Sequence, residues 1–367
     1  MKDRKTKWLA VAMAGTATAA LAQGQTPEAQ PDRAVEPVVL KPLRPEPRNR
    51  IGLSYRMGLN ITVDFRKLGG LAPVSNPGAE TGGAVDRTYD NGYNLVDITG
   101  NNHGPGFENT TWNWGYTGGG SVQGNTLVMS SSSSPATARS ENNGDDPQHG
   151  FELTYSRQYW ERGNWRFGFE GGLGYTHLNV SDSRRLVATV HRITDTFDVT
   201  GIVLPPAPYQ GTYEGPGPVI RSEPSQRQSS VIVSSTNTIV GGRELEAHVF
   251  SLRLGPYAEV PLNDRFTLLM SGGLYLAIGD TKFSFHEEVT VPGTGTEVHR
   301  GSHSQTDFLV GGYVGVNIAY ALTEEIDVFA GAQFQGAGTS VNKARGKVSV
   351  LDIGESIVVS IGASYSF

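Results

Sequence analysis

The chain has 367 residues, of which 37% are hydrophobic and 18% charged, with a formal net charge of −6 and no cysteine. The lack of cysteine excludes a disulfide scaffold, a Cys-ligated metal and a lipidated N-terminal cysteine, and the acidic balance argues against nucleic-acid binding. Glycine supplies 47 residues, nearly double the usual ~7%, which favours a wall of closely packed small side chains.

The first 22 residues have the layout of a secretory signal peptide. Basic residues come first, an apolar run from Trp8 to Ala14 follows, and Ala20-Leu21-Ala22 provides a cleavage site. Cleavage after Ala22 removes four Lys/Arg and one Asp, so the mature chain carries −6 − 3 = −9. Residues 23–50 are rich in proline and predict an extended linker on the periplasmic side.

Residues 51–65 show the clearest strand pattern of the chain. Eight apolar side chains alternate with small or polar ones: Ile51, Leu53, Tyr55, Met57, Leu59, Ile61, Val63 and Phe65. A period of two indicates a strand with one apolar face. Strands of soluble sandwiches usually have about 5–6 residues, so this length favours a strand that crosses a membrane with its apolar face in lipid.

Two long polar segments, 66–150 and 181–243, interrupt the strand pattern and are expected to be external loops. Short β-prone pieces within them carry polar groups on both faces, so we expect them to lie outside the lipid and to extend the barrel into solvent. Trp112, Trp114 and Tyr116 alternate in the first segment. They are expected either to fold the loop around an aromatic knot or to stack on sugar rings.

The remaining pattern predicts six further strands before the C-terminal one, near 151–160, 165–175, 250–260, 266–278, 308–322 and 326–334. Short turns at 161–164, 261–265 and 323–325 alternate with longer connections, including loops near 287–305 and 337–347. The prediction is therefore an all-β fold: a transmembrane antiparallel up-and-down barrel formed by residues 51–367. The predicted strand number is eight, with ten as the alternative.

The last strand has its apolar side chains on one face and ends in an aromatic residue. Its ending, Ser360-x-Gly362-x-x-Tyr365-x-Phe367, resembles the C-terminal signal that outer-membrane barrel proteins present to their assembly machinery. On this basis Gly362, Tyr365 and Phe367 are the candidate assembly-signal residues. The alternative for this stretch alone is the edge strand of a soluble sandwich.

Taken together, residues 51–367 resemble the eight-stranded outer-membrane barrel proteins, the class that includes the OmpA membrane domain, OmpX and OmpW. The resemblance rests on architecture and the terminal signal, and the two long segments depart from the compact members. It implies a Gram-negative cell envelope, an outer-membrane location with both termini in the periplasm, and contact with outer-membrane lipid, lipopolysaccharide and the barrel assembly machinery.

Alternation also predicts which charged side chains face the barrel interior. The predicted inward charges are Arg56, Asp64, Glu152, Arg166, Glu170, Arg253, Glu259, Asp307 and Asp327, and the candidate lumen network comprises all of them except Asp64 and Asp327. Both signs are present, so an ion-pair network can neutralise the buried charge. Because an eight-stranded barrel is just wide enough for its own side chains, we expect no wide pore.

The sequence offers no support for an enzyme, a cofactor or a metal site. There is no Gly-x-Ser-x-Gly motif, and His177 near Ser181 is a chance pairing in a serine-rich chain. Two functions remain open: a structural or surface-interaction barrel, and a porin-like narrow channel for small solutes or an apolar ligand.

Overall fold

The computed structural model describes residues 49–82, 85–96, 109–144 and 147–367. These belong to the second of two compact units, Leu43–Phe367. The predicted signal peptide and nearly all of the predicted linker lie outside the described residues. No helix in the described ranges is long and apolar enough to cross a membrane. Their regular structure is β, apart from one 3-10 turn, η1 Gly119–Ser121.

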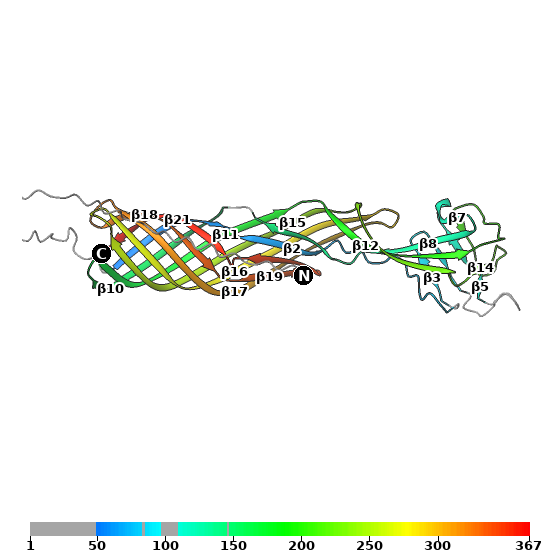
Figure 1. Cartoon of the computed structure of the whole chain (residues 1–367), viewed down its shortest axis with the longest axis horizontal. Helices are drawn as coiled ribbons and strands as arrows, with labels where there is room; N and C mark the ends of the chain where they lie inside the picture. The colour runs from blue at the N-terminus through cyan, green and yellow to red at the C-terminus, as the bar shows by residue number, and fades with distance from the viewer. Residues whose placement is uncertain (1–48, 83–84, 97–108, 145–146) are drawn as a thin grey trace, which may run out of the picture. The chain divides into compact units, whose positions relative to one another are not determined.

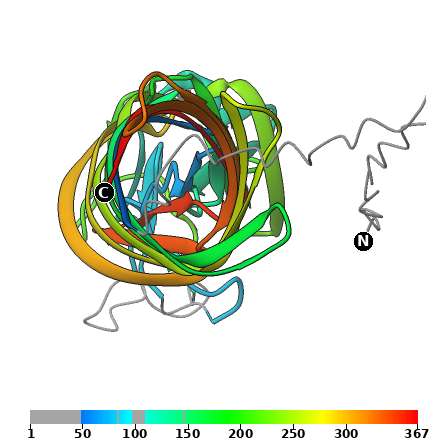
Figure 2. The same cartoon turned by 90° about the vertical axis from the view of Figure 1, so that its left-hand side faces the viewer.

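Eight antiparallel strands close into a hydrogen-bonded ring, which Figure 2 shows end-on. The ring strands are β1 Asn49–Leu59, β10 Gln148–Arg162, β11 Trp165–Asp182, β15 Gln226–Pro261, β16 Phe266–Val291, β17 Gly295–Ala321, β18 Ile326–Gly336 and β21 Ser356–Ser366. Each pairs with the ring strand before and after it in the chain, and β21 pairs with β1. The predicted eight-stranded up-and-down barrel is confirmed.

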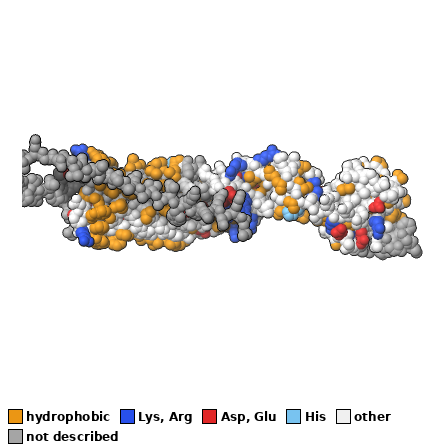
Figure 3. Space-filling model, viewed as in Figure 1, with side chains coloured by type: hydrophobic (Ala, Val, Ile, Leu, Met, Phe, Trp, Pro, Cys, Tyr) orange, Lys and Arg blue, Asp and Glu red, His pale blue; other side chains and the backbone are white. Residues whose placement is uncertain are grey.

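The outer surface of this ring is apolar, as Figure 3 shows for the part that holds β10, β18 and β21. Leu53 is 61% exposed, and residues of the same face on the other strands are exposed as well. They include Phe151, Leu153, Phe169, Leu173, Phe250, Leu254, Leu274, Ile278, Phe308, Val310, Val314, Phe334, Ile357 and Ile361. A continuous exposed apolar belt of this extent is typical of a surface that contacts lipid.

The predicted strand 51–65 is wrong in its second half, because the chain changes sides at Asn60. Asn60 adopts a left-handed backbone conformation (φ 60°) and separates β1 from β2 Thr62–Leu68. Asparagine tolerates this conformation better than most residues. The turn reverses the facing of the side chains: Val63 and Phe65 are completely buried, whereas Leu53 lies outside.

Beyond the apolar belt, the ring continues as two facing layers of strands. β11, β15, β16 and β17 run on, while a four-stranded sheet forms from β2, β9 Ala138–Asn143, β19 Thr339–Ala344 and β20 Lys347–Asp352. These four strands are the chain segments that adjoin β1, β10, β18 and β21. Figure 1 shows β2 and β19 beside the long strands. A single apolar core joins both layers, and Phe65 packs on Phe283 within it.

The loops predicted near 287–305 and 337–347 are largely strands. β16 and β17 leave only residues 292–294 as their turn, and β19 and β20 form a tight hairpin around Arg345 and Gly346. Charged residues at 287, 288 and 297 hid the alternation in the first of these hairpins. Its inward residues Val289 and Val291 are buried in a separate small core.

The long segments 66–150 and 181–243 are not simple loops either, because much of each is folded. Their strands are β3 Arg87–Tyr89, β4 Gly92–Asn94, β5 Thr110–Thr111, β6 Trp114–Tyr116, β7 Val122–Gln123, β8 Thr126–Ser133, β12 Leu186–Asp198, β13 Tyr209–Gln210 and β14 Ile220–Arg221. Strands of the two segments pair with each other, as in β6–β13, β5–β14 and β8–β12. We call the part formed by these nine strands the distal unit.

The aromatic knot in the distal unit is part of a core. Trp114 and Tyr116 are buried, and their rings stack with centroids 6.1 Å apart. The indole N–H of Trp114 donates to the carbonyl of Pro218, which belongs to the second segment. Because their faces are covered, these two rings are not available to stack on external sugars, and the structural interpretation of the cluster holds.

Candidate functional site: the filled barrel interior

The inward face of the ring carries charges of both signs at the level of the apolar belt. Within the described residues, the inward charges at this level are Arg50, Arg56, Arg166, Arg253, Glu152, Glu170, Glu259 and Asp327. The balance is 4 − 4 = 0, so the lumen holds no net charge. Neutral pairing lowers the cost of burying ionised side chains, which would otherwise reach several kcal/mol for each ion.

The carboxylate of Glu152 is the centre of the first group of ion pairs. Arg56 Nη1 lies 2.5 Å and Arg253 Nε 2.9 Å from the same Glu152 oxygen. Arg253 also pairs with Glu170, and its guanidinium lies 5.1 Å from the ring centre of Tyr313. Five strands, β1, β10, β11, β15 and β17, thus contribute to one buried polar network in the barrel interior.

Glu259 is the centre of a second group. Its carboxylate forms ion pairs with Arg50 at 3.1 Å and with Arg166 at 3.5 Å. Asp327 is close enough to Arg50 to attract it electrostatically. Arg50 was missed in the sequence because it was assigned to the proline-rich linker. The alternation Arg50, Gly52, Ser54, Arg56 would have identified it, since all four positions share the inward face.

Two predicted inward charges lie elsewhere. Asp64 lies on β2, beyond the reversal at Asn60, and pairs with Arg66. Asp307 accepts from Ser340 of β19 and from Gln305, and it lies on β17 beyond the level of the ion pairs. The remaining predicted lumen residues, Arg56, Glu152, Arg166, Glu170, Arg253 and Glu259, are brought together in the two groups described above.

Glycine makes room for these large side chains. A Cβ atom on Gly172 of β11 would lie 2.8 Å from Arg253 Nε, so any larger residue would displace the guanidinium. The network itself lines a cavity of about 60 Å³. A water molecule takes up about 30 Å³ in the liquid, so this space admits only a few waters.

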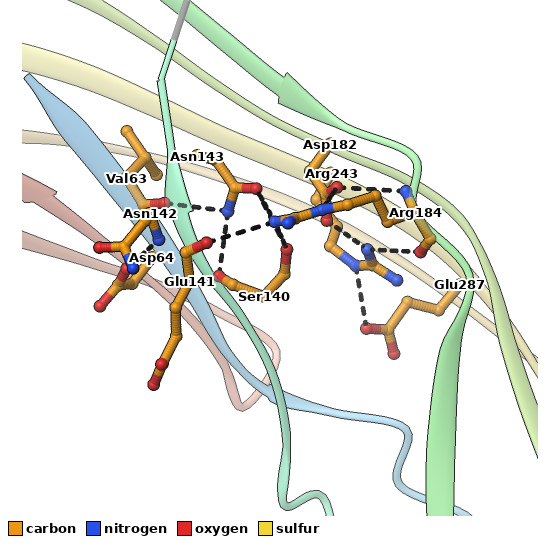
Figure 4. Close-up of polar contacts among 10 residues, drawn as sticks. All are labelled: Val63, Asp64, Ser140, Glu141, Asn142, Asn143, Asp182, Arg184, Arg243 and Glu287. Atoms are coloured by element: carbon orange, nitrogen blue, oxygen red, sulfur yellow. Dashed lines mark hydrogen bonds and ion pairs between the residues drawn. The ribbon is translucent and has the colours of Figure 1, made fainter.

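Above the ion pairs, the apolar core shared by the two layers fills the interior. Side chains from β2, including Val63 and Phe65, pack against inward residues of β11, β15 and β16. Further along, another polar group, the Asp182 cluster, joins the layers. Figure 4 shows its members Asp182, Arg184, Arg243, Glu287, Ser140 and Asn143, and Lys347 belongs to it as well.

The Asp182 cluster connects strands from both layers through buried charged groups together with the largely exposed Arg184. Arg243 donates to Asp182 at 2.7 Å and lies 3.9 Å from Glu287, whose other oxygen is 2.8 Å from Lys347 Nζ. Arg184 bridges Asp182, at 2.8 Å, to Ser140 of β9, at 2.6 Å (Figure 4). The interior is therefore occupied by side chains at three successive levels.

The candidate assembly-signal residues lie at the end of β21. The rings of Tyr365 and Phe367 are exposed on the outer face and stack with centroids 6.1 Å apart. The backbone of Phe367 pairs with Asn49, which closes the ring to the last residue. Gly362 faces inward, where a Cβ atom would lie 2.8 Å from the ring of Phe329 and 2.3 Å from the carbonyl oxygen of Leu53. Packing alone therefore requires glycine at this position.

Comparisons with known proteins find only distant structural similarity. No family model matches the chain, and no curated protein matches it. Solved structures that resemble it include Ail of Yersinia pestis (10% identity, TM-score 0.27, 87% of this chain and 97% of that chain), the outer membrane protease OmpT from Escherichia coli (10%, 0.33, 87% and 96%) and a Pseudomonas aeruginosa FadL homologue (10%, 0.16, 87% and 90%). TM-scores this low assign neither a fold nor an activity to this chain.

Proposed function

We propose that the mature chain is a non-enzymatic integral outer-membrane barrel that is closed to solutes and presents the distal unit outside the cell. Its role is structural or surface-interacting, and its partners are outer-membrane lipid, lipopolysaccharide and, during biogenesis, the barrel assembly machinery. The filled interior is the observation that carries the proposal. A conduit requires a continuous wet path, whereas this lumen offers a cavity of about 60 Å³ beneath an apolar core.

The membrane location is supported by the exposed apolar belt. On β1 it runs from Ile51 to Leu59, and on β21 from Ile357 to Phe367. Segments of this length agree with the 9–11 residues that a tilted strand uses to cross a bilayer. Aromatic residues gather at one edge, where Trp160 and Trp165 flank the β10–β11 turn, as expected of an interfacial girdle.

Conductance separates this proposal from the narrow channel. The mature chain, refolded in detergent and added to planar bilayers, is expected to insert without producing discrete current steps. A channel-forming barrel protein measured under the same conditions provides the positive control. Reproducible single-channel steps from the wild-type chain would replace the closed barrel with the channel.

Fractionation tests the location independently of conductance. In a Gram-negative host, the full chain is expected in the outer-membrane fraction and to migrate differently on gels before and after boiling. Recovery of native protein from the soluble periplasm would rule out the membrane location, whatever the bilayer recordings show.

A further inference from the structure

A row of histidines crosses the outer face of the barrel just beyond the apolar belt. His149 of β10 lies opposite His177 of β11, and His177 lies opposite His248 of β15. Two residues closer to the belt, the same three strands carry Phe151, Tyr175 and Phe250. On these three strands the row therefore lies next to the last apolar residues of the belt, and His149 and His177 are exposed.

Two of these histidines and one carboxylate form a compact group. The ligand atoms of His177, His248 and Glu246 lie within 4.8 Å of one another. His248 Nε2 is 3.7 Å from a carboxylate oxygen of Glu246, and the two imidazole rings have centroids 4.8 Å apart. Two imidazoles and one carboxylate from two adjacent strands thus lie close enough together to share one ion.

The hydroxyl of Tyr175 orients one of the imidazoles. It lies 2.8 Å from Nδ1 of His248. When Nδ1–H donates to this hydroxyl, the lone pair of Nε2 is free on the side of Glu246 and His177. A hydrogen bond to the far nitrogen of a ligating histidine is the usual way in which proteins set its tautomer and ring direction.

We propose that His177, Glu246 and His248 form a binding site for a divalent transition metal ion of the zinc class, with the fourth coordination position open to water or an external ligand. Metal–ligand bonds of about 2.0–2.2 Å in a tetrahedral site require ligand atoms about 3.3–3.6 Å apart. The His248–Glu246 pair is close to this separation, and the exposed His177 closes the remaining distance by a small rotation.

The site was not visible in the sequence, where no metal site was expected. His177 and His248 are 248 − 177 = 71 positions apart along the chain and meet because β11 and β15 pair in a fixed register. Glu246 and His248 share the outward face because they are two residues apart in one strand. The proposal depends only on this pairing and not on whether the barrel is closed.

Zinc titration of the tag-free mature chain in detergent tests the proposal. Isothermal calorimetry is expected to detect a saturable Zn²⁺ site, and Co²⁺ is expected to give the visible absorption of a tetrahedral N,O site. Glu246→Gln and His248→Ala should each weaken Zn²⁺ binding at least about tenfold. Tyr175→Phe should weaken it about tenfold through loss of the orienting hydrogen bond.

His149→Ala is the matched control, because His149 lies in the same row but engages Tyr55 through its Nδ1. Its affinity for Zn²⁺ should equal that of the wild type. Heat-modifiable gel migration shows that each variant is folded before titration. The absence of a saturable Zn²⁺ site in the wild type would overturn the proposal. So would Glu246→Gln and His248→Ala variants that bind Zn²⁺ with the affinity of the wild type.

Discussion

At the scale of single residues, Asp182 shows how a buried carboxylate is kept ionised. It lies seven positions beyond Tyr175 on β11, outside the apolar belt. Burial opposes its ionisation, but hydrogen bonds from Ser140, Arg184 and Arg243 outweigh this effect and lower the pKa of Asp182 to about 2. The charged form is therefore the one that holds the two layers of strands together.

The pH dependence of stability follows from this shift. A carboxylate whose pKa is lowered by folding contributes stability above its unfolded pKa of about 3.9, and this contribution is lost as the pH falls toward its folded pKa. Asp182→Asn should therefore unfold more easily than the wild type at pH 6, and the difference should narrow between about pH 4 and pH 2. Thermal unfolding in detergent at several pH values measures it.

Asp264→Asn, in the exposed turn between β15 and β16, serves as the control for this series. Its thermal unfolding temperature should change with pH as that of the wild type does. If the gap between the wild type and Asp182→Asn stays constant from pH 6 to pH 2, the carboxylate does not stabilise the fold through its charge.

At the scale of elements, β1 and β2 show that one unbroken alternation can serve two environments. The apolar side chains of β1 point to the outer belt, and those of β2 point into the shared core. Asn60 allows the change because its left-handed backbone rotates the pleat, and its side-chain amide donates to the carbonyl of Glu355 at 2.7 Å. The same residue types thus form an exposed belt on β1 and a packed core on β2.

Arginine substitutions should distinguish the two environments. Leu53→Arg places a charge in the lipid-facing belt and should cost about 2–4 kcal/mol when the chain is folded into lipid vesicles. In micelles the loss should be smaller, because detergent adapts around the charge. Val63→Arg buries an unpaired charge in the apolar core. It should prevent compact folding of the two facing strand layers beyond the belt, in vesicles and in micelles.

Urea unfolding in vesicles and micelles provides the measurement. Val314→Arg, on the outer face of β17, should behave like Leu53→Arg. Equal losses for Leu53→Arg and Val63→Arg in both media would contradict the assigned facings.

The C-terminal strand supports a second prediction, which separates packing from assembly. Gly362→Ala introduces a methyl group against Phe329 and the carbonyl of Leu53, so it should impair refolding of the purified chain. Phe367→Ala removes only a partly buried ring at the strand end, worth at most about 1–3 kcal/mol. It should lower the amount of barrel assembled in cells and leave refolding into detergent nearly unchanged.

Quantitative gels of outer-membrane fractions and of refolded protein measure the two effects. Normal assembly of Phe367→Ala in cells would show that the terminal ring is dispensable. Failure of the purified Phe367→Ala chain to refold would show that its role is structural.

At the scale of the Leu43–Phe367 unit, long continuous strands connect the barrel to the distal unit. β15 has 36 residues and pairs with β11, β16 and β12 along its length. β12 in turn pairs with β8 of the first long segment. Three short turns, around 163–164, 262–265 and 322–325, lie at the other ends of the ring strands. Under the proposed function these turns face the periplasm.

Single cysteines test this orientation cleanly, since the chain has none. Thr294→Cys, in the turn between β16 and β17, should react with a membrane-impermeant maleimide on intact cells. Asp264→Cys should react only after the outer membrane is permeabilised. Labelling of Asp264→Cys on intact cells with Thr294→Cys protected would reverse the proposed orientation of the barrel.

The sequence by itself determined the local features of this protein. Alternation with period two identified the ring strands, the outward apolar face and most of the inward charges, because the facing of a strand residue depends only on its neighbours in the chain. The short turns were equally visible, since turn residues act locally. The strand number followed from counting these elements.

Only the tertiary structure decided what depends on pairing between distant segments. The partners of Glu152, the meeting of His177 with His248, and the joint folding of the two long segments require registers between strands that are far apart in the chain. The reversal at Asn60 belongs to the same class, because the apolar pattern of 51–65 is identical for a lipid-facing and a core-facing strand. Removing apolar side chains from water is favourable both on the outer face and in the core. Only the strands packed against β2 show which of the two environments a residue occupies.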